Sequence, residues 1–335
     1  MTRSPLVERE LIVTSRGLKH DIDQAIGRDV VKALVELILN SDDSYRRLDA
    51  TQSDDIRVIH IGVDRRRRTA STMTVQDEAC GMTGEQLDVT LGKYGENTAD
   101  VTARGFFGRG LKEAILGVGS GTVRSTTAGA CVECTLAWSA EKPKYKRYPA
   151  TKAKPNASGT EVVVLVGRDD ADISIPLTDN LAESLERYFS LRDVMTNPLR
   201  RVVLKTAKSA RDLGYAEPTA TELLSVTQRV PGFEAEFHLT IKRADEALCS
   251  PAEEGALAPG GFLISSPKGI LALTSFRYSH NPDAERLFGR VHCPYLDELI
   301  LKNEPILKPT RDVEGLVWTH PFTRALKACV EEILR

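Results

Sequence analysis

Residues 36–43 read Glu36-Leu37-Ile38-Leu39-Asn40-Ser41-Asp42-Asp43, within a stretch, residues 21–44, whose apolar residues recur at helical spacing. Glu36 and Asn40 are four residues apart and Asp43 follows three later, so in a helix all three project from nearly the same side. An amide oxygen at Asn40 can bind a magnesium ion that carries phosphates, and the Glu36 carboxylate can take a proton from water. Taken alone, the pattern is more often the solvated face of an ordinary helix.

A second segment, Asp77-Glu78-Ala79-Cys80-Gly81-Met82, follows a β-branched run at residues 72–76 that predicts a strand. Asp77 would stand at the strand end, where its carboxylate can accept a hydrogen bond from the exocyclic amino group of adenine. Guanine has a carbonyl at that position. Gly81, which has no Cβ, would let the backbone approach a flat base. In isolation, this segment is more typical of a surface turn.

A third segment, Gly105-Phe106-Phe107-Gly108-Arg109-Gly110-Leu111-Lys112, precedes a predicted helix start at residues 113–116. Glycines before a helix leave backbone N–H groups free to bind phosphates, and the helix dipole adds partial positive charge. The segment matches neither a Walker loop, since no Gly-Lys-Ser/Thr follows, nor the dinucleotide fingerprint. The fourth segment is Gly159-Thr160.

In this order, the four segments resemble the GHKL superfamily, whose nucleotide site is the Bergerat fold of gyrase B, the ninety-kilodalton heat-shock chaperone, MutL and sensor histidine kinases. The resemblance covers about residues 20–165, and the Gly-x-x-Gly-x-Gly-x-Lys lid is most similar to the MORC, heat-shock-chaperone and MutL branch. It implies an α+β sandwich, a mostly antiparallel sheet with helices on one face, that binds ATP and Mg²⁺.

The resemblance also implies a role for each matching residue. Glu36 corresponds to the catalytic base, Asn40 to the magnesium ligand, Asp77 to the adenine reader and Thr160 to a second contact near the base. The implied nucleotide contacts are Asn40, Asp43, Asp77, Gly81, Met82, Gly105, Gly108, Arg109, Gly110, Leu111, Lys112, Thr160 and Lys308.

The chain departs from the family pattern at Ala79, where the second box usually carries its first glycine. A methyl group costs little there if the local φ is negative, but it strains the turn if φ is positive. The departure puts the affinity for the nucleotide in doubt.

The resemblance implies a magnesium-dependent ATPase that works as a switch. Closure of the lid and of residues 6–18 would form an ATP-dependent homodimer, which hydrolysis would release. The alternative is an ATP-sensing interaction module with negligible hydrolysis. A histidine kinase ranks lowest, because the one histidine before Glu36 is His20 and no long helical hairpin precedes it.

The composition fits a cytoplasmic protein. The chain has 335 residues, a formal net charge of -2 and six cysteines, and its pI is close to 6.4. It has no run of eighteen apolar residues and no signal-peptide pattern at its start. Cys131 and Cys134 have metal-ligand spacing, but they fall in a predicted strand without a second pair, so free thiols are expected.

Two domains are expected, an ATP-binding domain at residues 1–195 and a βαβ transducer-like domain at residues 196–335. The first contains strand-like runs at residues 56–63, 72–75, 122–127, 130–138 and 161–166, a turn at residues 117–121 and helical periodicity at residues 177–195. The second contains runs at residues 201–205, 233–242 and 261–273 and a closing helix at residues 321–334.

In the related families a transducer lysine reaches the terminal phosphate, and the candidates are Lys302 and Lys308. A solvated loop lysine is the competing interpretation. The chain ends on a helix, so a further C-terminal region is conceivable.

Two basic clusters raise the question of a nucleic-acid partner. Residues 65–68 are four arginines between two predicted strands, which favours a hairpin loop. Residues 142–148 read as a basic loop with two tyrosines, and Lys152 and Lys154 follow. Phosphate neutralisation by Lys142, Lys144, Lys146 and Arg147, with base stacking, is the hypothesis. The competing interpretation is a solvated charged turn.

Overall fold

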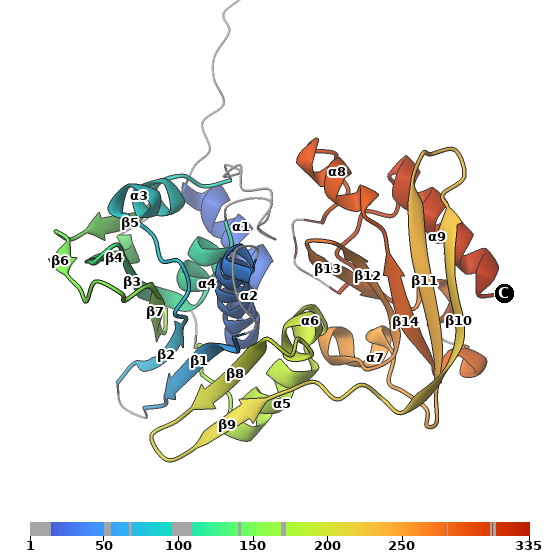
Figure 1. Ribbon diagram of the computed structural model, residues 1–335, viewed down its shortest axis with the longest axis horizontal. Helices are drawn as coiled ribbons and strands as arrows, with labels where there is room; N and C mark the ends of the chain where they lie inside the picture. Colours follow the sequence, from blue (N-terminus) through green and yellow to red (C-terminus); the bar gives the residue numbers. More distant parts are fainter. Residues whose placement is uncertain are drawn as a thin grey trace, which may run out of the picture.

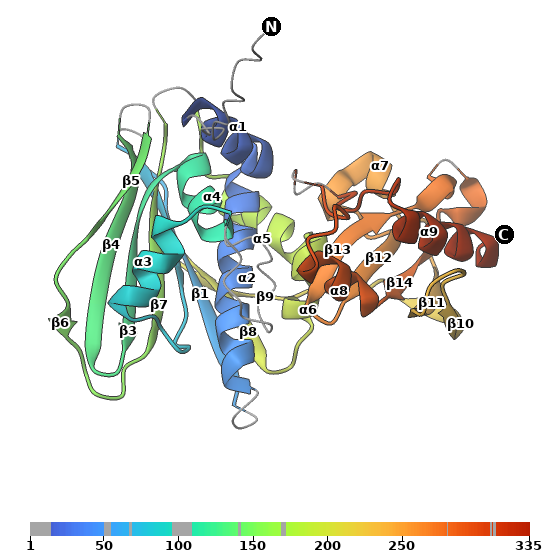
Figure 2. The same ribbon diagram turned by 90° about the horizontal axis from the view of Figure 1, so that it is seen from above.

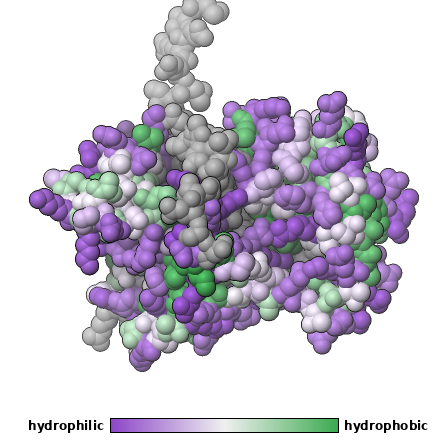
Figure 3. Space-filling view, in the orientation of Figure 1, coloured by the Kyte–Doolittle hydropathy of each residue, from purple (hydrophilic) through white to green (hydrophobic). Residues whose placement is uncertain are grey.

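A computed structural model describes residues 15–49, 55–66, 69–95, 109–139, 142–168, 172–279, 281–308, 310 and 313–335. These residues form two α/β units side by side, each built around its own sheet (Figure 1). Among them, no helix has the length and apolar character to cross a membrane. The visible face is mostly hydrophilic with separate small apolar areas (Figure 3).

The first unit contains a nine-stranded sheet in the order β5-β4-β3-β7-β2-β1-β8-β9, with β6 paired to β4. Its pairs are antiparallel except β1 with β8, which confirms a mostly antiparallel sheet. The strands are β1 (Arg57–Asp64), β2 (Ser71–Gln76), β3 (Gly119–Thr127), β4 (Ala130–Ser139), β5 (Lys142–Arg147), β6 (Thr151–Lys152), β7 (Gly159–Val166), β8 (Arg200–Lys205) and β9 (Ala210–Leu213).

Helices cover one face of this sheet, as expected (Figure 2). Alternating strand residues such as Ile59, Ile61 and Val63 face the helices and are buried in one core. The helices are α1 (Ser15–Ile26), α2 (Val30–Asp49), α3 (Gly84–Gly92), α4 (Gly110–Val118), α5 (Thr178–Arg187) and α6 (Arg192–Met195), with a 3₁₀ turn η1 (Phe189–Leu191). The expected helix at residues 177–195 is therefore divided into three pieces.

The single helix expected at residues 21–44 is two helices. Gly27 and Arg28 both adopt left-handed backbone conformations, with φ of 63° and 61°. A right-handed helix cannot pass through such residues. Asp29 then caps the second helix, because its Oδ1 accepts hydrogen bonds from the backbone N–H of Val31 and Lys32.

The turn expected at residues 117–121 is wrong. Helix α4 runs to Val118 and strand β3 starts at Gly119, so the two elements follow each other directly. A Cβ on Gly119 would lie 2.0 Å from the carbonyl oxygen of Leu165, and one on Gly117 would lie 2.8 Å from Cβ of Ile26. These glycines therefore serve close packing.

The second unit has a five-stranded sheet in the order β10-β11-β14-β12-β13, packed on helices α8 and α9. The expected closing helix is present, with Pro321 in its first turn. Strand β10 was not foreseen. The elements are β10 (Ala220–Arg229), β11 (Glu236–Ala244), α7 (Pro251–Glu254), η2 (Gly255–Leu257), β12 (Gly261–Ser266), β13 (Gly269–Thr274), η3 (Phe276–Tyr278), η4 (Pro282–Ala284), β14 (Leu287–His292), α8 (Tyr295–Leu301) and α9 (Pro321–Ile333).

The first sheet extends beyond the boundary expected at residue 196. Strand β8 pairs in parallel with β1, and β9 pairs with β8. The chain therefore leaves the first sheet after Leu213 and enters the second at Ala220. The run at residues 201–205 belongs to the first unit because its apolar residues Val202 and Leu204 complete that core.

Candidate ATP-binding site

Helix α2 carries Glu36, Asn40 and Asp43 within two turns, as expected from their spacing. Glu36 and Asn40 are partly buried, whereas Asp43 is buried. The side-chain Nδ2 of Asn40 is buried and has no hydrogen-bond partner among the described residues. A buried amide without a partner is costly, so a bound group next to Asn40 would remove that cost.

Asp77 stands directly after β2 and is the centre of a hydrogen-bonded cluster. Its Oδ1 accepts from the backbone N–H groups of Ala79 at 3.0 Å and Thr160 at 3.2 Å. Its Oδ2 accepts from the hydroxyl of Ser41 at 2.9 Å. The structure thus brings Asp77 and Thr160 together, although they are far apart in the sequence.

The Asp77 carboxylate keeps the capacity to accept one more hydrogen bond. Among the residues that the structure describes, three donors reach it, and a carboxylate has about four acceptor positions. Burial raises the pKa of Asp77, while the bonds from Ala79, Ser41 and Thr160 act in the opposite direction. An added donor such as an exocyclic amino group would further stabilise the ionised form. This arrangement fits the adenine-reading role.

Thr160 reaches the same cluster through its side chain. Its hydroxyl lies 2.9 Å from that of Ser125, which also accepts a hydrogen bond from the backbone N–H of Met82 at 2.7 Å. Met82 is partly buried against the first core. The loop after β2 is thereby fixed against strands β3 and β7.

The structure shows whether Ala79 strains the turn, and it changes the role expected for Gly81. Ala79 is buried and is not among the described residues with positive φ, so its methyl group does not strain the turn. Gly81 has φ of 65°, and a Cβ there would lie 2.0 Å from the carbonyl oxygen of Thr126. Its missing side chain therefore makes room for strand β3, where a flat base was expected.

The glycine-rich segment is described in part. Gly105 and Gly108 lie outside the described residues. Arg109 is the N-cap residue of α4, and Gly110, Leu111 and Lys112 form its first turn. A helix is present as expected, but it starts at Gly110, within the segment and three residues before the expected start.

Lys112 is buried on α4, and its amine donates a hydrogen bond to the backbone carbonyl of Thr90 in α3. Burial lowers the pKa of Lys112 from 10.5 to about 8. Its neighbour Glu113 is also buried, accepts a hydrogen bond from the Tyr94 hydroxyl at 2.8 Å and lies 3.5 Å from Nε of Arg109. A charged cluster thus occupies the first turn of α4.

Sequence reasoning missed three of these partners, Ser41, Ser125 and Glu113. Ser41 lies four residues after the buried Leu37, so helical periodicity could have placed it on the inward face of α2. Glu113 and Ser125 had no comparable signal, because a buried carboxylate and a buried hydroxyl are identified by their partners.

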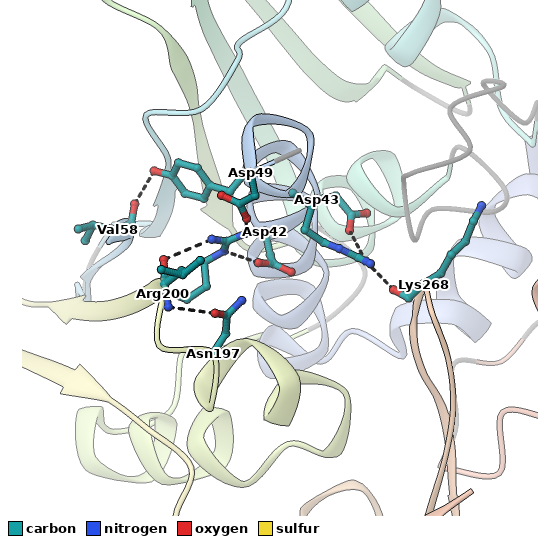
Figure 4. Close-up of polar contacts among 10 residues, drawn as sticks. Asp42, Asp43, Asp49, Val58, Asn197, Arg200 and Lys268 are labelled. Carbon is teal, nitrogen blue, oxygen red and sulfur yellow. Dashed lines mark hydrogen bonds and ion pairs between the residues drawn. The ribbon is translucent and has the colours of Figure 1, made fainter. Parts of the chain in front are cut away.

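The C-terminal half of α2 is fixed by buried Arg200, the first residue of β8 (Figure 4). Its guanidinium donates hydrogen bonds to Asp42, at 2.6 Å, and to Asp49. On the opposite side, Arg46 donates to the backbone carbonyls of Pro267 and Lys268, both at 2.8 Å. Helix α2 therefore connects the candidate site with both sheets.

The two lysines predicted as candidates for the terminal phosphate, Lys302 and Lys308, lie in the second unit. Lys302 is the C-cap residue of α8, and Lys308 lies on the following loop, where its amine donates to Glu314 at 2.8 Å.

Residues 142–147 form edge strand β5 rather than a loop. Lys142, Lys144 and Lys146 are exposed at alternating positions, so they line one face of it, and Arg147 pairs with Asp88 at 3.1 Å. Lysine and proline on an edge strand also discourage pairing with other chains.

Residues 29–163 match the family model described as histidine kinase-, DNA gyrase B-, and HSP90-like ATPase. No curated protein matches the chain significantly. The match spans α2, the Asp77 turn, α4 and the start of β7, which are the elements that form the candidate site. Residues 29–163 therefore belong to the GHKL superfamily of ATPases, which supports ATP binding by this part of the chain.

Proposed function

We propose that the chain hydrolyses ATP with the help of Mg²⁺ and uses the cycle as a conformational and dimerisation switch. The observation that supports this proposal is the contact between Ser41 and Asp77, because it joins the carboxylate that we propose as the adenine reader to the helix that carries Glu36 and Asn40. A base at Asp77 would leave the phosphates to extend toward that helix and the first turn of α4.

Each residue then has a proposed role. Glu36 takes a proton from the attacking water, and the side-chain oxygen of Asn40 binds the metal ion. Mg²⁺ supplies charge neutralisation on the phosphates and is usually held by one or two protein oxygens together with phosphate and water, which a single amide ligand fits. Arg109 and Lys112 contribute positive charge, and Thr160 supports the base contact.

The second unit is proposed to act as the transducer. Lys308 is the candidate from the sequence for the lysine that reaches the terminal phosphate. Lys268 is a second candidate, because it is buried in the turn that Arg46 attaches to α2. Each lysine should be replaced by alanine in turn. The variant that loses ATP hydrolysis identifies the lysine that reaches the terminal phosphate.

Phosphate release at saturating Mg-ATP tests the proposal. Glu36→Gln keeps the side-chain shape but removes the base, so it should bind ATP and accumulate dimer without turnover. Asp77→Ala should lose ATP binding in calorimetry. Equal, measurable phosphate release by wild type and Glu36→Gln would remove Glu36 from the mechanism. Release by wild type no faster than the uncatalysed background would instead favour an ATP-sensing module with negligible hydrolysis.

Nucleic-acid binding through β5 is a further proposal, supported by the three lysines on one exposed face. Replacing Lys142, Lys144 and Lys146 by glutamine should weaken binding to single- or double-stranded DNA and reduce its salt dependence. Changing the exposed Arg229 of β10 serves as the control for a general loss of charge. Unchanged DNA affinity in the triple variant would leave edge protection as the role of these lysines.

A further inference from the structure

Arg46 joins the helix of the ATP site to a single turn of the second unit. Its two terminal nitrogens donate to consecutive carbonyl oxygens, those of Pro267 and Lys268, at 2.8 Å each. Figure 4 shows the contact at Lys268. The planar fork of a guanidinium suits such a paired contact, which a lysine amine could not reproduce. The turn connects β12 and β13.

The same turn is held from its own unit. The backbone N–H of Lys268 donates to Oδ2 of Asp297 in α8 at 3.2 Å. Ser266, Lys268 and Asp297 are all buried. The turn is therefore held by residues of both units. A change in its contact with α2 would also change its contact with α8.

Arg46 also contacts the ATP site. Its Nη1 lies 3.9 Å from Oδ1 of Asp43, one turn earlier on α2. Asp43 is an expected nucleotide contact, and Asn40 lies six residues before Arg46, about 9 Å along the helix axis. One guanidinium is thus shared between a carboxylate of the site and two carbonyls of the second unit.

We propose that Arg46 is a positioning residue that couples ATP binding to the second unit. This inference rests on the proposed function, because it requires that Mg-ATP engages Asp43. Both hydrogen bonds from Arg46 to the turn are already formed, at 2.8 Å. A ligand that draws on the Asp43 carboxylate therefore acts through charge: it removes a counter-charge of Arg46 and strengthens those two bonds. The two states differ in this contact, so ATP can shift the balance between them.

Hydrogen exchange of the full chain, with and without a non-hydrolysable ATP analogue, tests the coupling. In wild type the analogue should slow exchange in residues 263–273. Arg46→Ala should bind the analogue within about threefold of wild type but lose this response. Arg46→Lys keeps the positive charge but lacks the planar guanidinium, so it should lose most of the exchange response in residues 263–273. This second variant keeps the test valid if the alanine variant misfolds.

Arg290→Ala is the matched control. Arg290 joins β14 to Asp193 of α6 in a paired contact that also links the two units but does not touch α2. It should keep the response. If wild type binds the analogue without any change in residues 263–273, or if Arg290→Ala loses the response equally, the coupling is refuted while the proposed function stands. Calorimetry that detects no binding by wild type would refute both.

Discussion

The hydroxyl of Ser41 donates a hydrogen bond to Oδ2 of Asp77 over 2.9 Å, and this contact joins α2 to the end of β2. Asp77, the residue proposed to read the base, is therefore oriented by Ser41, the residue next to Asn40. If the proposed roles hold, binding of the base and positioning of the phosphates cannot be independent, because both depend on the placement of this helix against the sheet.

Ser41→Ala should weaken ATP binding by about tenfold, since a buried hydrogen bond to a charged group contributes about 1.5–3 kcal/mol. The turnover number at saturating ATP should change little, because Glu36 and Asn40 remain. Calorimetry and phosphate release measure the two effects. Ser44→Ala, on the same helix, is the control and should leave both unchanged. A fall in turnover with unchanged affinity would contradict the orienting role of Ser41.

Asp77→Asn should bind ATP at least about tenfold more weakly, because the amide is a poorer acceptor than a carboxylate. It should not destabilise the free protein. Burial raises the folded pKa of Asp77, so this group favours folding at low pH and loses that contribution as pH rises through the folded pKa. The melting temperature of Asp77→Asn should therefore equal or exceed that of wild type at neutral pH. A lower melting temperature would mean that the ionised carboxylate stabilises the fold.

Lys112 should make ATP binding depend on pH. Its folded pKa is lowered from 10.5 to about 8, so the amine loses its proton above that pH in the free protein. ATP affinity should then be about tenfold weaker near pH 9 than near pH 7. Lys112→Arg keeps its charge and should abolish this difference.

The same shift predicts a stability effect of opposite direction. The penalty for burying the Lys112 charge is complete below the folded pKa and disappears above the unfolded one, so the free energy of unfolding should rise between about pH 8 and pH 10.5. Lys112→Met should remove that rise. Denaturation with urea at several pH values measures it, and parallel curves for wild type and Lys112→Met would contradict the assignment.

Arg200→Ala should lower the free energy of unfolding by about 3–5 kcal/mol, because it leaves buried Asp42 and part of Asp49 without a counter-charge. The adjacent Arg201 offers a matched control. It pairs with Asp212 on the surface, where both side chains are more than half exposed, so its replacement should cost less than about 1 kcal/mol. Similar losses for the two variants would argue against a structural role for the buried cluster.

Gly81→Ala should prevent folding or destabilise the protein severely, since the new methyl group would overlap the backbone of Thr126. Gly95 also has positive φ, 82°, but no atom of the described residues lies within 4 Å of where its Cβ would be. Gly95→Ala should therefore cost only the backbone strain, about 1 kcal/mol. The difference between the melting temperatures of Gly81→Ala and Gly95→Ala measures the cost of the steric overlap beyond the cost of the backbone strain.

The sequence alone indicated the GHKL superfamily for residues 29–163, because the four segments are local patterns of residue type and spacing. The expected strands at residues 56–63, 130–138 and 161–166 also appear, since period-two alternation of apolar residues is visible without any partner. The break at Gly27 was readable in principle, because a glycine followed by Asp29 is a signal for the end of one helix and the cap of the next.

Only the tertiary structure decided which residues and strands the predicted elements contact. No periodicity shows that β8 pairs with β1, that Arg200 faces Asp42, or that residues 142–147 extend a sheet as its edge strand. Pairing between distant strands and ion pairs between distant elements depend on the whole chain being folded. For that reason the border of the first unit, the partners of Asp77 and the contact of Arg46 with the second unit emerged only in three dimensions.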